Sequence, residues 1–313
     1  MENEKAFYEK LERRGVSRRD FMKYCTFLTA TMGLSSSFVP QVAEVFAAPA
    51  QRPPVIWLHF GECTGCSEAV LRSQYPYADD LVLEILSLEY HETIMAAAGQ
   101  QAEDQLHAAA KKYEGKFICV VEGAIATKFD GGYGKIGGRT FLEIGKDICT
   151  KAAGVICIGS CSSFGNIQAA APNPGGYKGV GEALGIKTVN IAGCPPNPVN
   201  FVGTVVNYLL LGKLPDLDDL GRPLFAYGKS IHDQCPRRAH FENDEFVELF
   251  GSEEAAAGYC LYKVGCRGPE TYNNCPIAKF NDGTSWPIEA GAPCIGCSEP
   301  AFWDKFTPFY EEL

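Results

Sequence analysis

Ten of the fourteen cysteines, together with one histidine, fall into three groups whose spacing is typical of metal ligands. In chain order the groups are Cys63, Cys66, Cys161 and Cys194; His232, Cys235, Cys260 and Cys266; and Cys275, Cys294 and Cys297. Thiolates in such numbers bind soft metals, above all iron–sulfur clusters. The sequence therefore predicts three iron–sulfur clusters.

The first group offers the four thiolates that a cubic [4Fe–4S] cluster needs for its four irons. Cys63 and Cys66 have the C-x-x-C spacing that chelates metal from one turn. Glycines lie beside these cysteines, at Gly61, Gly65, Gly159 and Gly193, and they let the backbone approach a cluster closely. We expect a [4Fe–4S] cluster here.

The second group contains a histidine, and a lone histidine is more often an ordinary core or surface residue. We therefore assign no metal to His59, His91, His107 or His240. His232 differs because it lies three residues before Cys235, in a segment where three thiols require a fourth ligand. A neutral imidazole lowers the negative charge of a cluster. This favours a [4Fe–4S] cluster near the surface, which acts as the exit for electrons.

The third group is one ligand short. Pro287 lies between Cys275 and the Cys294–Cys297 pair, where a fourth thiol could have stood. The expected occupant is a [3Fe–4S] cluster, and a water-ligated [4Fe–4S] cluster or a structural zinc is the alternative. The other four cysteines are one in the N-terminal segment and three in apolar runs, where they are expected to be buried as small hydrophobes: Cys25, Cys119, Cys149 and Cys157.

A disulfide framework of up to seven bridges is a competing hypothesis. It suits small secreted scaffolds, whereas this chain has 313 residues and 46% hydrophobic residues, enough for a core without covalent cross-links. A colourless protein without iron or acid-labile sulfide would support the disulfide hypothesis.

The elements that position the first group alternate between apolar runs and helical stretches. Strands are expected over 55–60, 81–88, 116–121, 154–158 and 187–191, and helices over 68–73, 96–113, 139–152 and 200–211. This alternation predicts a flavodoxin-like, doubly wound parallel α/β sheet. Cys63 and Cys66 follow one strand, and Cys161 and Cys194 each follow another, so four thiols converge at the carboxyl edge, where ligands of such sheets bind.

After Leu211 the pattern changes. Pro215 and Pro223 mark a linker, and beyond it Gly, Pro, Asn and Cys are frequent while regular periodicity is absent. We expect a sheet domain over 51–220 and a largely irregular iron–sulfur domain over 221–313, in which bound metal adds to the folding energy. No C-terminal apolar span is present.

The N-terminal segment 1–50 has the pattern of a twin-arginine signal peptide. Arg18 and Arg19 precede an apolar stretch that ends in small residues, with cleavage expected after Ala47 or Ala50. A surface amphipathic helix is the alternative. This route exports folded proteins to the periplasm, which suits a chain whose cofactors are inserted first.

The charge of the chain excludes some partners. Residues 1–50 carry seven Lys or Arg and six Asp or Glu, a formal charge of +1. Because the whole chain has a formal charge of −10, residues 51–313 carry −11. Nucleic acid and anionic membranes repel such a chain, and a basic protein partner is favoured.

At these residues the sequence resembles the small subunits of periplasmic nickel–iron hydrogenases. The motifs that carry the resemblance are E-C-T-G-C-S-E at 62–68, E-Y-H-E-T-I-M-A-A-A-G at 89–99, V-E-G-A-I at 121–125, G-S-C-S-S-F-G at 159–165, G-C-P-P-N-P at 193–198, H-D-Q-C-P at 232–236 and P-C-I-G-C-S-E-P at 293–300. The resemblance implies that the first, third and second groups hold proximal [4Fe–4S], medial [3Fe–4S] and distal [4Fe–4S] clusters.

The resemblance also implies partners. The Ni–Fe centre belongs to a large subunit, so no residue here is catalytic, and a multihaem c-type cytochrome accepts the electrons. Oxygen-tolerant relatives carry extra cysteines at the positions of Gly65 and Asn166, so an oxygen-sensitive enzyme is expected. A free-standing multi-cluster carrier without a partner is the alternative, and a quinone-reductase-type carrier would lack the second and third groups.

Overall fold

The computed structural model describes residues 2–47, 52–73, 76–281 and 283–312. Its centre is a parallel sheet of five strands in the order β2-β1-β3-β7-β9. These strands are β1 (Pro54–His59), β2 (Ser87–His91), β3 (Ile118–Glu122), β7 (Gly154–Ile158) and β9 (Val189–Ile191). Numbered within the sheet, this is the order 2-1-3-4-5 of flavodoxin-like folds, so the predicted fold class is confirmed.

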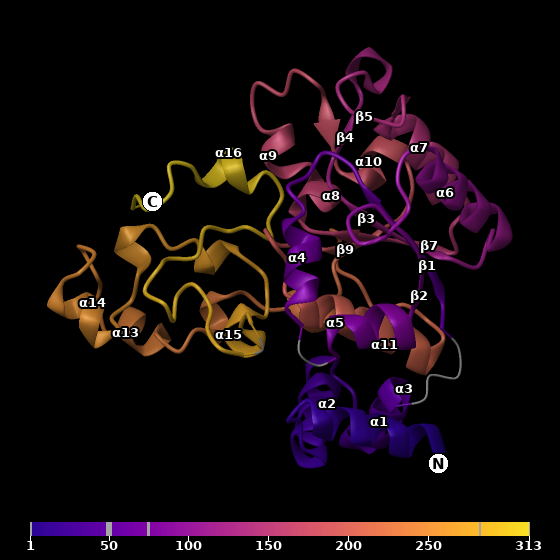
Figure 1. Cartoon of the computed structure of the whole chain (residues 1–313). Coiled ribbons are helices and arrows are strands. Elements are labelled where there is room, and N and C mark those ends of the chain that lie inside the picture. The colour runs from indigo at the N-terminus through magenta and orange to yellow at the C-terminus, as the bar shows by residue number, and fades with distance from the viewer. Residues whose placement is uncertain (1, 48–51, 74–75, 282, 313) are drawn as a thin grey trace.

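Alternate residues of each strand pack on opposite faces, as the twofold period of a strand requires. Val55 and Trp57 of β1 belong to one core, and Ile56 and Leu58 belong to the other. The first core is completed by α11 (Pro198–Leu211) and the N-terminal helices, and the second by α6 (Gln100–Lys112) and α7 (Phe141–Ile148). Helices therefore cover both faces of the sheet (Figure 1).

One expected strand is wrong in its bounds. Residues 81–88 were expected to be extended, but Leu81–Ile85 form one π-helical turn and β2 begins at Ser87. Leu81 and Ile85 are buried, whereas Leu83 is 61% exposed. Burial of positions four residues apart is a helical pattern, which a segment this short and this rich in leucine does not distinguish from a strand.

Short elements connect and extend this sheet domain. They are α4 (Gly65–Leu71), α5 (Ala78–Asp80), β4 (Ile125–Ala126), β5 (Lys135–Ile136), β6 (Arg139–Thr140), α8 (Ser160–Phe164), α9 (Asn166–Ala169), β8 (Tyr177–Lys178) and α10 (Val180–Leu184). The strand β4 pairs with β8, and β5 pairs with β6, both antiparallel.

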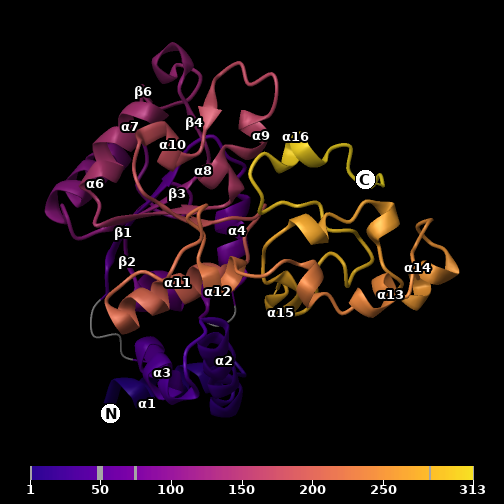
Figure 2. The same cartoon turned by 180° about the vertical axis from the view of Figure 1, so that it is seen from behind.

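The C-terminal part lies beside the carboxyl edge of the sheet as a separate lobe, with α4 between them (Figures 1 and 2). Its helices are α12 (Leu224–Tyr227), α13 (Arg238–Glu242), α14 (Glu253–Ala257), α15 (Cys275–Ala278) and α16 (Phe302–Phe306). A small core around Trp286 and Leu261 includes the candidate ligands Cys266 and Cys275. The lobe is largely irregular, as predicted.

The N-terminal segment forms α1 (Glu2–Arg13), α2 (Arg18–Thr31) and α3 (Val39–Ala47). These helices pack beneath α11 (Figure 1), and Phe21, Leu28 and Phe46 share a core with Phe201 of α11. The cleavage points expected after Ala47 and after Ala50 lie at the start of residues 48–51 and within them, and these residues are outside the described part of the structure. Within the described residues, no helix has the length and apolar character needed to cross a membrane.

Candidate metal centres

The four thiols of the first group come together at the carboxyl edge of the sheet. Cys63 and Cys66 follow β1, Cys161 lies in α8 after β7, and Cys194 follows β9. Burial raises the pKa of Cys66 well above its ordinary value, and the nearby Glu122, Cys161, Cys194 and Cys63 raise it further. The predicted convergence of these thiols is therefore present in the fold.

The backbone around these thiols leaves room that a side chain would fill. A Cβ atom on Gly159, whose φ is +94°, would lie 2.4 Å from Sγ of Cys66. A Cβ atom on Gly65 would lie 3.1 Å from Sγ of Cys63. Both glycines thus stand where a larger residue would press on a ligand sulfur.

The raised pKa values of the other thiols in the first group also fit a metal site. Desolvation raises the pKa of Cys161 to about 12, and partial desolvation raises that of Cys194, although this residue also reaches the surface. Buried thiolates are costly unless a cation compensates them, and metal binding removes the thiol protons. The donor set fits an iron–sulfur cluster, which would supply that compensation.

A polar network that the sequence analysis missed holds the first group in place. The Glu122 carboxylate, 1% exposed, accepts hydrogen bonds from the backbone N–H of Cys66 at 2.9 Å and of Ser67 at 3.0 Å. It also accepts one from the Ser67 hydroxyl at 2.6 Å. Glu122 thereby fixes the first turn of α4, which carries Cys66.

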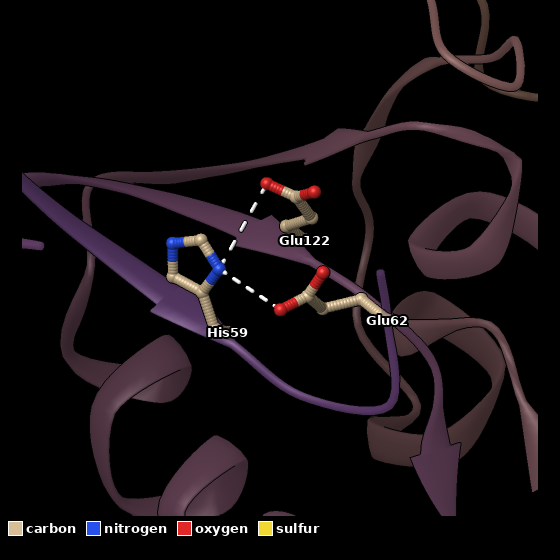
Figure 3. Close-up of side chains that lie close together, drawn as sticks. All are labelled: His59, Glu62 and Glu122. Atoms are coloured by element: carbon tan, nitrogen blue, oxygen red, sulfur yellow. Dashed lines mark hydrogen bonds and ion pairs between the residues drawn. The ribbon is translucent and has the colours of Figure 1, made fainter. Parts of the chain in front are cut away.

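His59 and Glu62 complete this network (Figure 3). Nδ1 of His59 lies 3.3 Å from Glu62 and 3.9 Å from Glu122. His59 and Glu122 are the paired last residues of β1 and β3. Among the described residues, His59, Glu62 and Glu122 are the one set of three His, Cys, Asp or Glu residues whose potential ligand atoms all lie within 4.8 Å of one another.

His91 lies beside His59, with ring centroids 4.7 Å apart. Burial lowers the pKa of His91 to about 3, so its ring is neutral at pH 7. His59 and His91 are both buried in the core. His91 nonetheless lies close to the first group, because its Nε2 is 3.4 Å from the hydroxyl of Ser67, the residue after Cys66.

The third group lies in the C-terminal lobe. Burial raises the pKa of Cys275 well above its ordinary value, and Cys297 and Cys294 raise it further. Burial likewise raises the pKa of Cys297 to about 11. The structure thus brings these three thiols together, while Pro287 is exposed between the buried Trp286 and Ile288.

The second group lines one small cavity of the lobe, formed in part by His232, Cys235, Cys260 and Cys266. Desolvation lowers the pKa of His232, which favours the neutral imidazole that ligates metal. A Cβ atom on Gly268 would lie 3.3 Å from Sγ of Cys266. The predicted fourth ligand therefore lies with its three thiols.

The three groups contact one another in an order that differs from the chain order. Cys297 of the third group lies near Cys194 of the first, whose backbone N–H and thiol both influence the pKa of Cys297. Cys294 of the third group interacts with Cys266 of the second, and the Arg267 N–H donates to the Cys294 carbonyl at 2.8 Å. The three-thiol group is therefore the middle one.

The remaining cysteines are buried as expected, with Cys25, Cys119 and Cys157 at 0% exposure and Cys149 at 3%. All fourteen cysteines are free thiols in this fold. Sγ of Cys119 lies 3.7 Å from Sγ of Cys149, too far for a disulfide bond of about 2.05 Å.

A flavodoxin-like sheet with thiols at its carboxyl edge, continued by a second thiol-rich lobe, defines an iron–sulfur electron-transfer subunit. Two family models match the chain. Residues 63–208 match the 20 kDa subunit of NADH ubiquinone oxidoreductase, and residues 227–310 match the C-terminal domain of the NiFe/NiFeSe hydrogenase small subunit. Together they span both parts of the fold.

Similar proteins extend this match over nearly the whole chain. The periplasmic [NiFe] hydrogenase small subunit 1 of Nitratidesulfovibrio vulgaris is 56% identical over 97% of this chain and 96% of its own length. The periplasmic [NiFe] hydrogenase small subunit of Solidesulfovibrio fructosivorans is 54% identical over the same shares. The solved [NiFeSe] hydrogenase of Desulfomicrobium baculatum, in its reduced form, superimposes with a TM-score of 0.79 at 37% identity, over 84% of this chain and 100% of that one.

The chain belongs to the small subunits of nickel–iron hydrogenases. It is the electron-transfer part of an oxidoreductase and pairs with a large hydrogenase subunit. Members of this family carry iron–sulfur clusters and work with a Ni–Fe centre.

Proposed function

We propose that this chain passes electrons between the large subunit's Ni–Fe site and a periplasmic cytochrome through three clusters in a fixed order. The proximal [4Fe–4S] is held by the first group, the medial [3Fe–4S] by Cys275, Cys294 and Cys297, and the distal [4Fe–4S] by the second group. The observation that carries this proposal is a pair of hydrogen bonds that place the third group between the other two. The Ser160 hydroxyl, next to Cys161, donates to the Cys297 carbonyl, and the Arg267 N–H, next to Cys266, donates to the Cys294 carbonyl.

The two ends of the series reach the surface, as a relay requires. Cys63 and Cys194 of the first group are exposed, so this site can face the large subunit. His232 and Cys235 are partly exposed at the other end, whereas Cys275 in the middle group is buried. Bound clusters would supply one-electron centres, and the chain fixes their spacing, shielding and charge.

The sulfur positions support clusters over zinc. In tetrahedral zinc the Zn–S distance of about 2.3 Å places sulfurs roughly 3.8 Å apart. Within the residues that the structure describes, no three candidate thiols lie within 4.8 Å of one another. Ligands spread around a larger inorganic core fit this separation.

Metal analysis of the purified heterodimer tests the assignment. We expect about eleven irons in this subunit, from two four-iron clusters and one three-iron cluster, with matching acid-labile sulfide and a three-iron EPR signal. Zinc in place of the middle cluster, or irons sufficient for only two clusters, would overturn it. Loss of the three-iron signal in Cys275→Ser, with both four-iron signals retained, would place the medial site.

We further propose that residues 1–50 direct export of the folded protein by the twin-arginine route to the periplasm. Arg18 and Arg19 are exposed at the start of α2, where a receptor can reach them, and Ser17 caps this helix through Asp20 N–H. The similar small subunits of Nitratidesulfovibrio vulgaris and Solidesulfovibrio fructosivorans are both named as periplasmic, which supports this proposal.

A second arginine pair gives a matched control for this export signal. In Arg18→Lys/Arg19→Lys, we expect assembled enzyme to accumulate in the cytoplasm. Arg13→Lys/Arg14→Lys changes a pair in the same segment, where Arg14 binds Asp79, and should leave export intact. Equal periplasmic activity in both variants would contradict the twin-arginine route.

The electron acceptor that we propose is a multihaem c-type cytochrome with a basic face. Residues 51–313 carry a formal charge of −11, which attracts such a protein and steers its encounter. We also propose a domain boundary near residue 220, because one family model ends at residue 208 and the other begins at residue 227.

A further inference from the structure

Asn166 lies beside the first group, and among the described residues the hydrogen bond of its side chain goes to a thiol of that group. It begins α9, five residues after Cys161, and is 3% exposed. Its Nδ2 donates to Sγ of Cys161 at 3.6 Å. Among the described residues, its Oδ1 is buried without any hydrogen-bond partner.

An unpaired buried amide oxygen costs free energy, since it loses its bond to water. Asn166 accepts this cost while its nitrogen points at a ligand sulfur. Filling the space does not by itself account for an amide whose N–H faces a ligand sulfur. The arrangement indicates a role for the N–H···S contact.

The backbone at this position explains which residues fit. Asn166 has φ of +48°, a left-handed conformation that Gly, Asn and Asp adopt readily. Of these three, glycine has no side chain to donate a hydrogen bond, and an ionised aspartate is only an acceptor. Asparagine is the one that supplies an N–H donor to the sulfur.

The donor also acts on a second thiol. Burial raises the pKa of Cys161 and of Cys194, and the Asn166 amide opposes the rise in both. Gln168 adds a weaker opposing effect at Cys161. A group that stabilises negative sulfur on two ligands of one cluster also stabilises the reduced form of that cluster, which carries one more electron.

We propose that Asn166 is a positioning and tuning residue that raises the reduction potential of the proximal cluster through its amide hydrogen bond to the ligand sulfur. This inference rests on the proposed assignment of the proximal cluster. A higher proximal potential makes this site a better acceptor of electrons that leave the large subunit.

Asn166→Gly is the sharpest test, because glycine adopts the left-handed backbone and removes only the amide. Hydrogen bonds to an anionic acceptor strengthen with its charge. We expect the ratio of oxidised to reduced proximal cluster at a fixed potential to rise roughly three- to tenfold, which is a fall of about 28 to 59 mV for one electron. The readout is an EPR-monitored redox titration of the purified heterodimer.

Asn173→Gly is the matched control. Asn173 is also an asparagine with positive φ, at +42°, but its amide donates to the Tyr177 carbonyl at 3.0 Å and not to sulfur. The control should leave the proximal potential unchanged, and both variants should leave the medial and distal potentials unchanged.

The outcomes separate this inference from the function on which it rests. A proximal signal in Asn166→Gly at the wild-type potential would overturn the tuning role and leave the cluster assignment standing. Absence of a second four-iron signal from wild type and variant alike would overturn the assignment itself. An equal shift in Asn173→Gly would show that loop packing, and not the hydrogen bond to sulfur, sets the potential.

Discussion

Replacing Glu122 by Gln should loosen the turn that carries Cys66. The carboxylate accepts three hydrogen bonds, from two backbone N–H groups and the Ser67 hydroxyl. A Gln amide has one oxygen, so its NH2 must face one of the two backbone donors. That N–H is then buried without an acceptor, in a position where the wild-type residue is 1% exposed.

The magnitude follows from the bonds that are lost. A hydrogen bond to a charged group contributes about 1.5–3 kcal/mol, and an unsatisfied buried donor costs about 1–3 kcal/mol. These values describe overlapping parts of one loss, so we expect Glu122→Gln to destabilise the site by roughly 2–4 kcal/mol. Ser67→Ala removes only the hydroxyl donor and leaves both N–H bonds, so it should cost about 1 kcal/mol.

The assay compares the rate at which a chelator removes iron from the purified heterodimer, together with its melting temperature. Glu122→Gln should lose proximal iron fastest, Ser67→Ala should be intermediate, and wild type should be slowest. If Glu122→Gln retains proximal iron as well as wild type does, the carboxylate does not hold the α4 turn and the reasoning is refuted.

Three further changes probe other parts of the fold. Gly159→Ala should prevent loading of the proximal site alone, because its Cβ would lie 2.4 Å from Sγ of Cys66, whereas Gly154→Ala meets no atom within 4 Å and should load normally by iron analysis. Arg222→Met should lower stability by about 3–5 kcal/mol in a thermal melt, since it leaves Glu299 buried without its cation, and adding Glu299→Gln should restore part of this loss. Raising ionic strength from 0.01 to 0.15 M shortens the screening length from about 30 to 8 Å. This should slow reduction of a basic cytochrome but not of a small uncharged acceptor, and equal rates at both salt levels would contradict electrostatic steering.

The sheet and its thiol edge could be predicted because their signals are local. The strands β1, β7 and β9 are short and mostly apolar, and Cys63, Cys161 and Cys194 each lie a few residues after one of them, so chain order alone brings these three thiols to one edge. The π-helical turn at Leu81–Ile85 was missed because Glu84 is the one polar residue in its five positions, and a single interruption does not distinguish a helical period from a strand.

The supporting residues could not be predicted, because their partners are distant in sequence. Glu122 meets Cys66 and Ser67 only through the register that pairs His59 with Glu122 across β1 and β3. Asn166 stood out in the sequence as the absence of a cysteine, and the fold turns its amide toward Cys161. Tertiary register, which no local pattern encodes, decides both contacts.

The middle place of the third group depends on the last part of the chain returning to the sheet. The Ser160 hydroxyl donates to the Cys297 carbonyl, and Arg222 donates to the Ser298 carbonyl at 3.1 Å and to Glu299 at 2.9 Å. Segment 294–299 therefore supplies two of the three thiols of the third group and also joins the two lobes. Because Cys294 and Cys297 follow every other candidate ligand in chain order, the proposed relay can form only after all of these ligands have been synthesised, which suits export of a folded protein.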